Sequence, residues 1–164
     1  MRTNAATALL FVGIAVFPTV SAHAETHEDA IHWLALNIYH EARGEGIEGQ
    51  LAAGRVVMNR VKSPDYPNTV KGVVTDGTER GARCDFSWYC DGKPDTPTDR
   101  DAFAIASVVA SAVLDGYETA IPACAHSYHA AQIPQNGYFL RLAPVIRIGA
   151  HVFYCDKQKD PLVS

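Results

Sequence analysis

The hydrophobic period of the sequence changes near Gly116, and this change limits the folds open to the chain. Before it, apolar residues recur at three- and four-residue spacing, which predicts amphipathic helices. The helical segments are 26–44, 47–62 and 98–116. After it, the short runs 145–148 and 151–154 flank Gly149 and predict a β-hairpin. Helices followed by a small antiparallel sheet make an α+β domain.

The stretch between the second and third predicted helices is long for a loop. Residues 69–74 form a short apolar element that the sequence leaves undecided between helix and strand. Residues 76–97 hold many Gly, Pro and Asp residues together with Cys84 and Cys90. Connections of this length without secondary structure are uncommon in small domains, and many of those that occur are functional. We therefore expect a functional loop, or one pinned by a disulfide.

The first 24 residues have the layout of a secretory signal peptide. Arg2 supplies a positive charge, Ala5–Phe17 is an uncharged apolar run, and Ala22-His23-Ala24 is a small-x-small cleavage site. The run is too short for a good membrane span, and an uncleaved N-terminal anchor is the alternative. We predict a signal peptide over residues 1–24 and a mature domain over residues 25–164. That domain is expected to be periplasmic or secreted, with no stable membrane insertion after cleavage.

Export changes what the four cysteines indicate. An even number of cysteines in an exported chain suggests disulfides, because oxidising compartments preserve them. Four cysteines allow three connectivities. Cys84 and Cys90 bracket a short loop and are the favoured local pair, which leaves Cys124 with Cys155. No Cys-x-x-Cys is present, and this disfavours a zinc knuckle.

The charge balance narrows the range of partners. Lys plus Arg is 14 and Asp plus Glu is 18, so the net charge is −4. A chain without positive excess is poorly suited to displace phosphate counterions, so nucleic-acid binding is not expected. With 48% hydrophobic residues in 164, the composition is that of an ordinary single globular domain, which we expect to be a monomer.

One carboxylate continues the apolar face of the first predicted helix. Positions separated by four, three and four residues follow this face: Leu34, Ile38, Glu41 and Glu45. A carboxylate on a core-facing side either forms a buried salt bridge or acts as a general acid whose pKa an apolar pocket raises, as in lysozyme. Glu45 is a possible nucleophile. We favour for it a structural role, pairing with an Arg or capping the next helix.

The loop between Cys84 and Cys90 is aromatic. It holds Phe86, Ser87 and Trp88. Sugar rings stack on aromatic faces, and their hydroxyls bond to groups such as the Ser hydroxyl, so the loop suits the wall of a sugar-binding groove. The alternative is that Phe86 and Trp88 fill the core beneath a long loop.

The histidines raise the question of a metal. His40-Glu41 is not followed by the second His of the H-E-x-x-H zinc motif. His126 and His129 lie on a strand-like segment, where their spacing points the two rings to opposite faces. We therefore expect no metal and no cofactor, and we interpret His151 as a structural histidine.

Seven stretches, in order along residues 34–154, resemble the SleB/CwlJ-type cell wall hydrolases, the family of the spore cortex-lytic enzymes. These stretches are Tyr39-His40-Glu41-Ala42-Arg43-Gly44-Glu45, Glu48-Gly49-Gln50, Val56-Val57-Met58-Asn59-Arg60-Val61, Tyr66-Pro67-Asn68-Thr69-Val70, Cys84-Asp85-Phe86-Ser87-Trp88, Ser127-Tyr128-His129-Ala130 and Ile148-Gly149-Ala150-His151-Val152-Phe153. Asp85 departs from the Gln expected before Phe-Ser-Trp.

The resemblance implies a small lysozyme- or lytic-transglycosylase-like domain that cleaves peptidoglycan between N-acetylmuramic acid and N-acetylglucosamine. It implies that Glu41 is the catalytic acid and base, that Tyr128 and His129 line the groove near it, and that no metal takes part. On the second predicted helix, Gln50, Asn59 and Arg60 are expected to bond to loop backbone or to Glu45 rather than to substrate.

A single well-placed acid favours a transglycosylase. The C6 hydroxyl of the sugar then replaces water, and one residue serves first as acid and then as base, which leaves a 1,6-anhydro-muramic acid end. The sequence does not fix the positions of Asp76, Asp85 and Asp91 in their irregular loop. Two other functions stay open: a zinc amidase or peptidase acting on the peptide stems, which needs three clear ligands, and a non-catalytic wall-binding module, which does not need Glu41.

Overall fold

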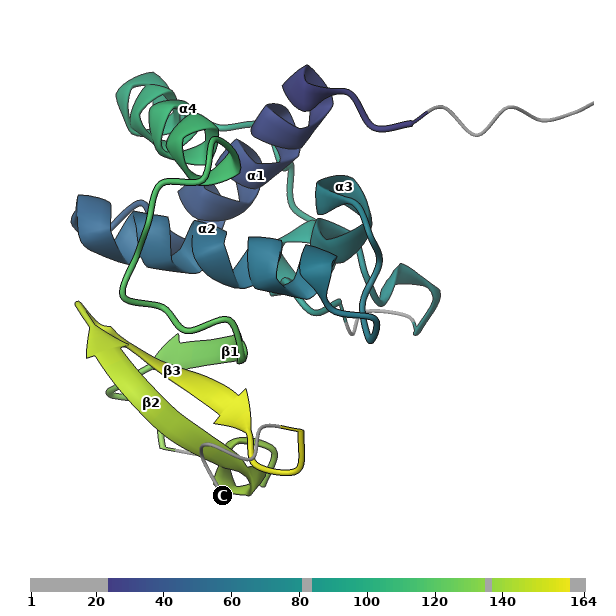
Figure 1. The fold of residues 1–164 in the computed structure, drawn as a ribbon. Helices are drawn as coiled ribbons and strands as arrows, with labels where there is room; N and C mark the ends of the chain where they lie inside the picture. The colour runs from purple at the N-terminus through teal and green to yellow at the C-terminus, as the bar shows by residue number, and fades with distance from the viewer. Residues whose placement is uncertain (1–23, 81–83, 135–136, 160–164) are drawn as a thin grey trace, which may run out of the picture.

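The computed structural model describes residues 24–80, 84–134 and 137–159, which form a helical body and a small sheet (Figure 1). The helices are α1 (His27–Ala42), α2 (Ile47–Lys62), α3 (Val70–Val74) and α4 (Arg100–Leu114). Three 3-10 turns are η1 (Thr78–Arg80), η2 (Ser87–Cys90) and η3 (Phe139–Arg141). The strands are β1 (Ala125–Ala130), β2 (Leu142–Ile148) and β3 (His151–Asp156). The predicted α+β order, helices first and a small antiparallel sheet after them, is confirmed.

Local capping explains where the helices begin. Thr26 and Asp29 form the capping box of α1, so two of the first free amides of the helix are satisfied. The cap of α4 is Asp99, one residue after the predicted Thr98, and its carboxylate accepts from the Ala102 amide at 3.0 Å. The undecided segment 69–74 contains helix α3, because Thr69 caps it through its side chain.

The core of the helical body lies among α1, α2 and α4. The helices approach closely at Gly54 of α2, where an added Cβ would lie 3.1 Å from Ile38 Cδ1 and 3.2 Å from Val113 Cγ2. A larger residue there would require the Ile38 and Val113 side chains to shift. Phe86 and Trp88 of the long loop are also buried in this core, as the core-filling alternative predicts.

The sheet lies beneath α2, in the order β1-β3-β2 with both pairings antiparallel (Figure 1). The predicted hairpin is formed by β2 and β3, and Gly149 between them has a φ of 57°, a left-handed conformation that glycine adopts readily. The third strand, β1, pairs with β3. A second apolar cluster holds the sheet against α2 and includes Val56 and Phe153.

Both predicted disulfides are present. Cys84 is bonded to Cys90 within the long loop, and Cys124 is bonded to Cys155, which joins the start of β1 to β3. The predicted signal peptide lies outside the described residues except for Ala24, so it stays a prediction. Within the described ranges, none of the helices has both the length and the hydropathy needed to span a bilayer.

Candidate active site

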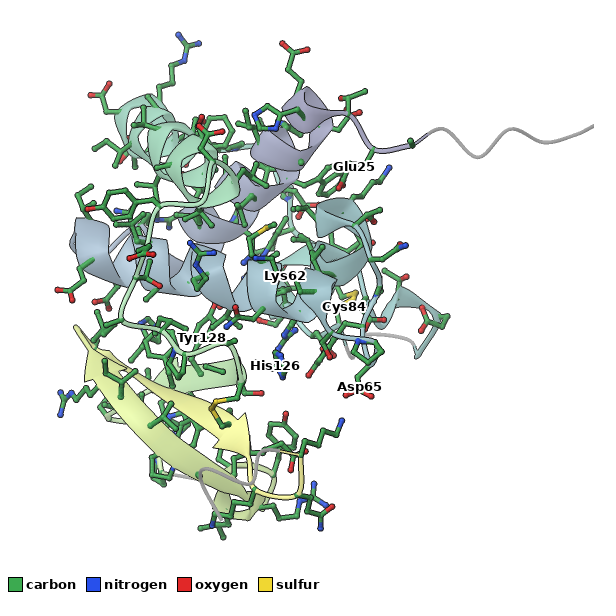
Figure 2. The ribbon with its side chains drawn as sticks, in the orientation of Figure 1. Glu25, Lys62, Asp65, Cys84, His126 and Tyr128 are labelled. Atoms are coloured by element: carbon green, nitrogen blue, oxygen red, sulfur yellow. A yellow bond between two sulfur atoms is a disulfide. The ribbon has the colours of Figure 1, made fainter. Side chains whose placement is uncertain are left out.

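A cleft of about 240 Å³ opens at the seam, the boundary between the helical body and the sheet. It is lined by side chains from the end of α1, from α2, from the long loop, from β1 and from the segment before β2. The lining residues are Glu41, Arg60, Asp85, Phe86, Ser127, Tyr128, Tyr138 and Phe139. Figure 2 shows Tyr128 and His126 of β1 between α2 and the rest of the sheet. Two layers of the fold therefore meet in this cleft.

Glu41 brings a carboxyl group into the cleft from the last turn of α1. Burial raises its pKa above the usual value for a glutamate, and this effect outweighs the Tyr128 hydroxyl and the Arg60 charge, which both lower it. The carboxyl group therefore keeps its proton to a higher pH than an exposed glutamate does. This is the property that a general acid needs near neutral pH.

Tyr128 faces Glu41 from the sheet. Burial and the Glu41 charge raise the pKa of its phenol well above the usual value, so the hydroxyl stays protonated. Its oxygen has no hydrogen-bond partner of ordinary geometry among the described residues, although it is near enough to act on the pKa of Glu41. The Tyr128 ring packs against His151 and Phe153, each at 5.3 Å between ring centroids. Its position is thus set by β3.

An ion pair between Arg60 and Asp85 lines the same cleft as the Glu41 carboxyl group. Arg60 Nη1 is 3.1 Å from Asp85 Oδ2, and Arg60 Nε donates to the His126 carbonyl oxygen at 2.8 Å. The guanidinium also lies 5.1 Å from the centre of the Tyr66 ring and 5.0 Å from that of Phe86. These contacts on several sides fix Arg60, and through it the side chain of Asp85, at one wall of the cleft.

The aromatic loop divides between two sites. Phe86 lines the Glu41 cleft, whereas Ser87 is exposed at the start of η2 and is absent from the cleft lining. Trp88 is 7% exposed, and its indole nitrogen donates to Asn37 Oδ1 at 3.0 Å. The Trp88 ring stacks on His40 at 4.4 Å and borders a separate hollow of about 360 Å³. The structure therefore brings Phe86, but not Ser87 or Trp88, to Glu41.

His129 also lies away from Glu41. Its Nε2 is 3.0 Å from the Tyr154 hydroxyl, and its ring is 4.4 Å from that of Phe139. His129 touches the cleft lining through Phe139 but is not itself part of the lining. Neighbouring residues on a strand face opposite sides of the sheet, which separates His129 from Tyr128.

Glu45 ties the α1–α2 connection to the hairpin. Its Oε2 accepts from the Ala150 amide at 3.1 Å, and its Oε1 is 3.4 Å from His151 Nδ1. Gly149 sits directly against it, since a Cβ there would come within 2.0 Å of Glu45 Oε2. Glu45 therefore holds the hairpin turn against the helical body. Its contacts are structural, but they are neither the Arg pairing nor the cap of α2 that the sequence suggested, because the cap residue of α2 is Gly46 and receives no side-chain hydrogen bond.

The two amide side chains of α2 bond to backbone, as expected. Gln50 Nε2 donates to the Glu45 carbonyl oxygen at 3.1 Å. Asn59 Nδ2 donates to the carbonyl oxygens of Pro122 and Ala125, at 2.9 and 3.0 Å. Asn59 thus holds the start of β1, the strand that carries Tyr128.

Sequence reasoning missed four cleft residues: Arg60 as a lining residue, Ser127, Tyr138 and Phe139. Ser127 Oγ and the Tyr138 hydroxyl are 2.9 Å apart, which links β1 to the segment before η3. Ser127 belongs to a matching stretch, and this was the available signal. Tyr138 and Phe139 belong to no motif, and their position depends on the path of the segment that connects β1 to β2. Over the described residues, no group of three or more His, Cys, Asp or Glu side chains is arranged to hold a metal.

Comparison with known proteins shows relatives in one family. The cell wall hydrolase profile matches residues 44–154, a stretch that begins just after Glu41. The spore cortex-lytic enzyme of Halalkalibacterium halodurans is 30% identical over 127 residues, which are 77% of this chain and 34% of that protein. The spore cortex-lytic enzyme of Bacillus subtilis is 52% identical over 44 residues, which are 27% of this chain and 14% of that protein. The chain thus matches about a third of the first relative's length and less of the second.

Two solved structures share the fold. The catalytic domain of the Bacillus cereus SleB protein aligns with a TM-score of 0.59 and 26% identity, over 79% of this chain and 91% of that one. The catalytic domain of the germination-specific lytic transglycosylase SleB from Bacillus anthracis aligns with a TM-score of 0.61 and 24% identity, over 83% and 98%. The predicted lysozyme-like fold is confirmed by these matches. With the family profile covering more than half of its residues, the chain belongs to the cell wall hydrolase family.

Proposed function

We propose that this protein cleaves the glycan strands of peptidoglycan, with Glu41 as the catalytic acid and base. The observation that carries the proposal is the partly buried carboxyl group of Glu41, with its raised pKa, in the cleft at the seam. Family membership supports peptidoglycan as the substrate. The names of the relatives, spore cortex-lytic enzymes and a germination-specific lytic transglycosylase, support cleavage of the glycan.

The reaction needs one residue to act twice. Protonated Glu41 donates its proton to the glycosidic oxygen, and the bond from this oxygen to C1 of the muramic acid breaks. The Glu41 carboxylate then takes the proton of the C6 hydroxyl, whose oxygen bonds to C1 and closes a 1,6-anhydro ring. The protonated Tyr128 hydroxyl is suited to donate to the carboxylate between the two steps. Glu41 ends in its starting state.

Hydrolysis is the alternative route, and Asp85 is the residue that could activate the water for it. Of the three loop aspartates considered from the sequence, Asp85 lines the cleft with Glu41, whereas Asp91 borders the other hollow. A second carboxylate in the cleft is what an inverting glycosidase uses to activate water. Its ion pair with Arg60 favours the transglycosylase, because the guanidinium competes for the basic oxygen.

The products of the reaction distinguish the two routes. We expect purified peptidoglycan treated with the protein to release fragments with anhydro ends, one water lighter than hydrolysed fragments in mass spectrometry. The Glu41→Gln variant should release none. Fragments with reducing ends alone would reject the transglycosylase route, and fragments cut only in the peptide stems would reject glycan cleavage.

We also propose that the protein is exported to the periplasm or secreted after cleavage behind Ala24, and that it acts as a monomer. The layout of residues 1–24 supports export, and the two disulfides support an oxidising compartment. Intact-mass measurement with and without reduction should give a chain that starts at Glu25 and gains four hydrogens on reduction. A chain that retains residues 1–24, or that holds four free thiols, would contradict this proposal.

A further inference from the structure

The Asp85 side chain is held at the cleft wall by a buried cation. The Arg60 side chain is 10% exposed, whereas that of Asp85 is 29% exposed, so the pair presents its carboxylate to solvent and keeps its guanidinium inside. Both residues line the cleft with Glu41. The accessible partner of the pair is therefore an acceptor fixed in place beside the proposed catalytic group.

The loop has other restraints besides this ion pair. The Cys84–Cys90 disulfide closes it, the Asp85 amide donates to the Asp76 carbonyl oxygen at 3.1 Å, and Phe86 is buried in the core. Burying an arginine is costly unless its charge is paired, so Arg60 needs an anionic partner, and Asp85 provides it. The ion pair thus accounts for the charge of Asp85, whereas the place of its more exposed carboxylate in the lining of the Glu41 cleft goes beyond a structural role.

The chemistry of a glycan strand fits a fixed carboxylate. Sugar hydroxyls and acetamido N–H groups are donors, whereas a carboxylate offers about four acceptor positions and no donor when ionised. The Asp85 carboxylate is paired with the Arg60 guanidinium, and hydrogen bonds to charged acceptors are roughly twice as strong as those to neutral acceptors. The same negative charge disfavours anionic groups at that point of the strand.

We infer that Asp85 is a substrate-binding residue that accepts hydrogen bonds from hydroxyl or acetamido N–H groups of the glycan strand, with Arg60 as its positioning residue. This inference rests on the proposed function. It differs from the hydrolytic role of a base, because a binding residue acts on affinity rather than on the chemical step. The expected loss on neutralising Asp85 is about ten- to hundred-fold in affinity, the usual range for a hydrogen bond to a charged group.

The test measures binding without turnover. In the Glu41→Gln background, calorimetry follows the binding of soluble peptidoglycan glycan strands freed of their stem peptides. Asp85→Asn should weaken binding by about ten- to hundred-fold. Asp85→Gln carries the residue expected from the family motif and is therefore compatible with the fold. It should also weaken binding, by less than Asn if its longer amide reaches the strand.

Asp91 provides a matched control. It lies in the same loop, is paired with Lys93 at 3.1 Å, and has a side chain 33% exposed, but it does not line the Glu41 cleft. Asp91→Asn should leave affinity unchanged within about twofold, an effect typical of surface positions. In the active protein, Asp85→Asn should raise KM and leave kcat within about threefold, and melting curves should show all variants folded.

Each result has a distinct meaning. If both Asp85 variants fold and bind as tightly as the Glu41→Gln parent, Asp85 does not contact the strand and the inference is wrong. A large fall in kcat with unchanged KM would make Asp85 a group of the chemical step, which also overturns the inference. If the parent itself binds no glycan strand, the proposed function fails, and the inference fails with it.

Discussion

The helical body and the sheet are held together by different physics. The helices α1, α2 and α4 share a large apolar cluster in which side chains such as Leu34 and Val57 are fully buried. The sheet has a smaller cluster and is fixed to the body by directional polar contacts from Glu45, Asn59 and Arg60. Apolar packing gives stability without fixing angles, whereas hydrogen bonds fix geometry at modest net gain. The cleft lies where geometry matters, at the seam.

The largest effect is expected from a substitution at the seam that leaves both the helical body and the sheet intact. Glu41→Gln keeps the shape of the side chain but removes its proton transfer, so we expect wall-lytic activity to fall about 10²–10⁴-fold. The melting temperature should not fall. The measurement is release of soluble fragments from peptidoglycan, with Glu48→Gln, an exposed glutamate of α2, as the control. If the Glu41→Gln variant keeps a tenth or more of the activity, Glu41 is not the catalytic acid and base.

Damage to the helical body should appear in stability and not in catalysis. Leu34 is 0% exposed, and Leu34→Ala should lower the free energy of unfolding by about 2–5 kcal/mol. Because Leu34 does not line the cleft, kcat per folded molecule should change little. Urea unfolding and initial rates at low temperature measure the two effects. A loss of kcat at unchanged stability would mean that the two layers are not as separate as their contacts suggest.

Loss of the Asn59 hydrogen bonds between α2 and the start of β1 should lower both the stability of the protein and its kcat/KM. Asn59→Ala removes the side-chain donor from the buried Ala125 carbonyl, at a cost of about 1–3 kcal/mol, and one of the two donors from the Pro122 carbonyl, which keeps the Ala125 amide. It also releases the start of β1, which carries Tyr128, so kcat/KM should fall beyond what the unfolded fraction explains. Thr26→Ala is the control, because loss of that exposed cap costs about 1 kcal/mol far from the seam. Equal kinetics for the two variants would contradict the directional role of Asn59.

The smallest expected effect is a pH dependence carried by Glu41. Its pKa is raised in the folded state by burial, so its contribution to stability is present below the unfolded pKa and is lost as pH rises through the folded pKa. The Glu41→Gln variant has no titrating group at this position, so it does not lose stability in this way as pH rises. The stability of the variant relative to the native protein should therefore increase from about pH 3 to about pH 8, as thermal melts across that range would show. A difference that is constant over the range would mean that Glu41 titrates as an exposed residue.

Local sequence pattern predicts the helical body well because helices are local structures. The bounds of α2 are those of the predicted segment 47–62, and the cap of α4 is displaced by one residue. The hairpin around Gly149 is predicted for the same reason, since its turn and both strands are neighbours in the sequence. The partly buried position of Glu41 also follows from spacing along one helix.

The rest of the cleft depends on contacts between distant segments. Arg60 and Asp85 are 25 positions apart in the sequence but form an ion pair, and the Tyr138 hydroxyl contacts Ser127 from the segment that connects β1 to β2. Trp88 shows the opposite case, because its place in an aromatic loop favours substrate contact while its buried bond to Asn37 ties it to the core. Residue type and spacing do not decide such choices, since tertiary packing selects among them.

The Glu45 contact with the hairpin has a consequence for the order in which the protein acquires its shape. It joins positions 105 apart, so the α1–α2 connection waits for almost the whole chain to be made. Contacts between segments distant in the sequence form late in folding, because bringing the segments together costs chain entropy before the contact is made. The helix that carries Glu41 is thus available early, while the strand that places Tyr128 gains its partner β3 only at the end. A truncated chain that lacks β3 would therefore carry Glu41 without the cleft in which we propose that it acts.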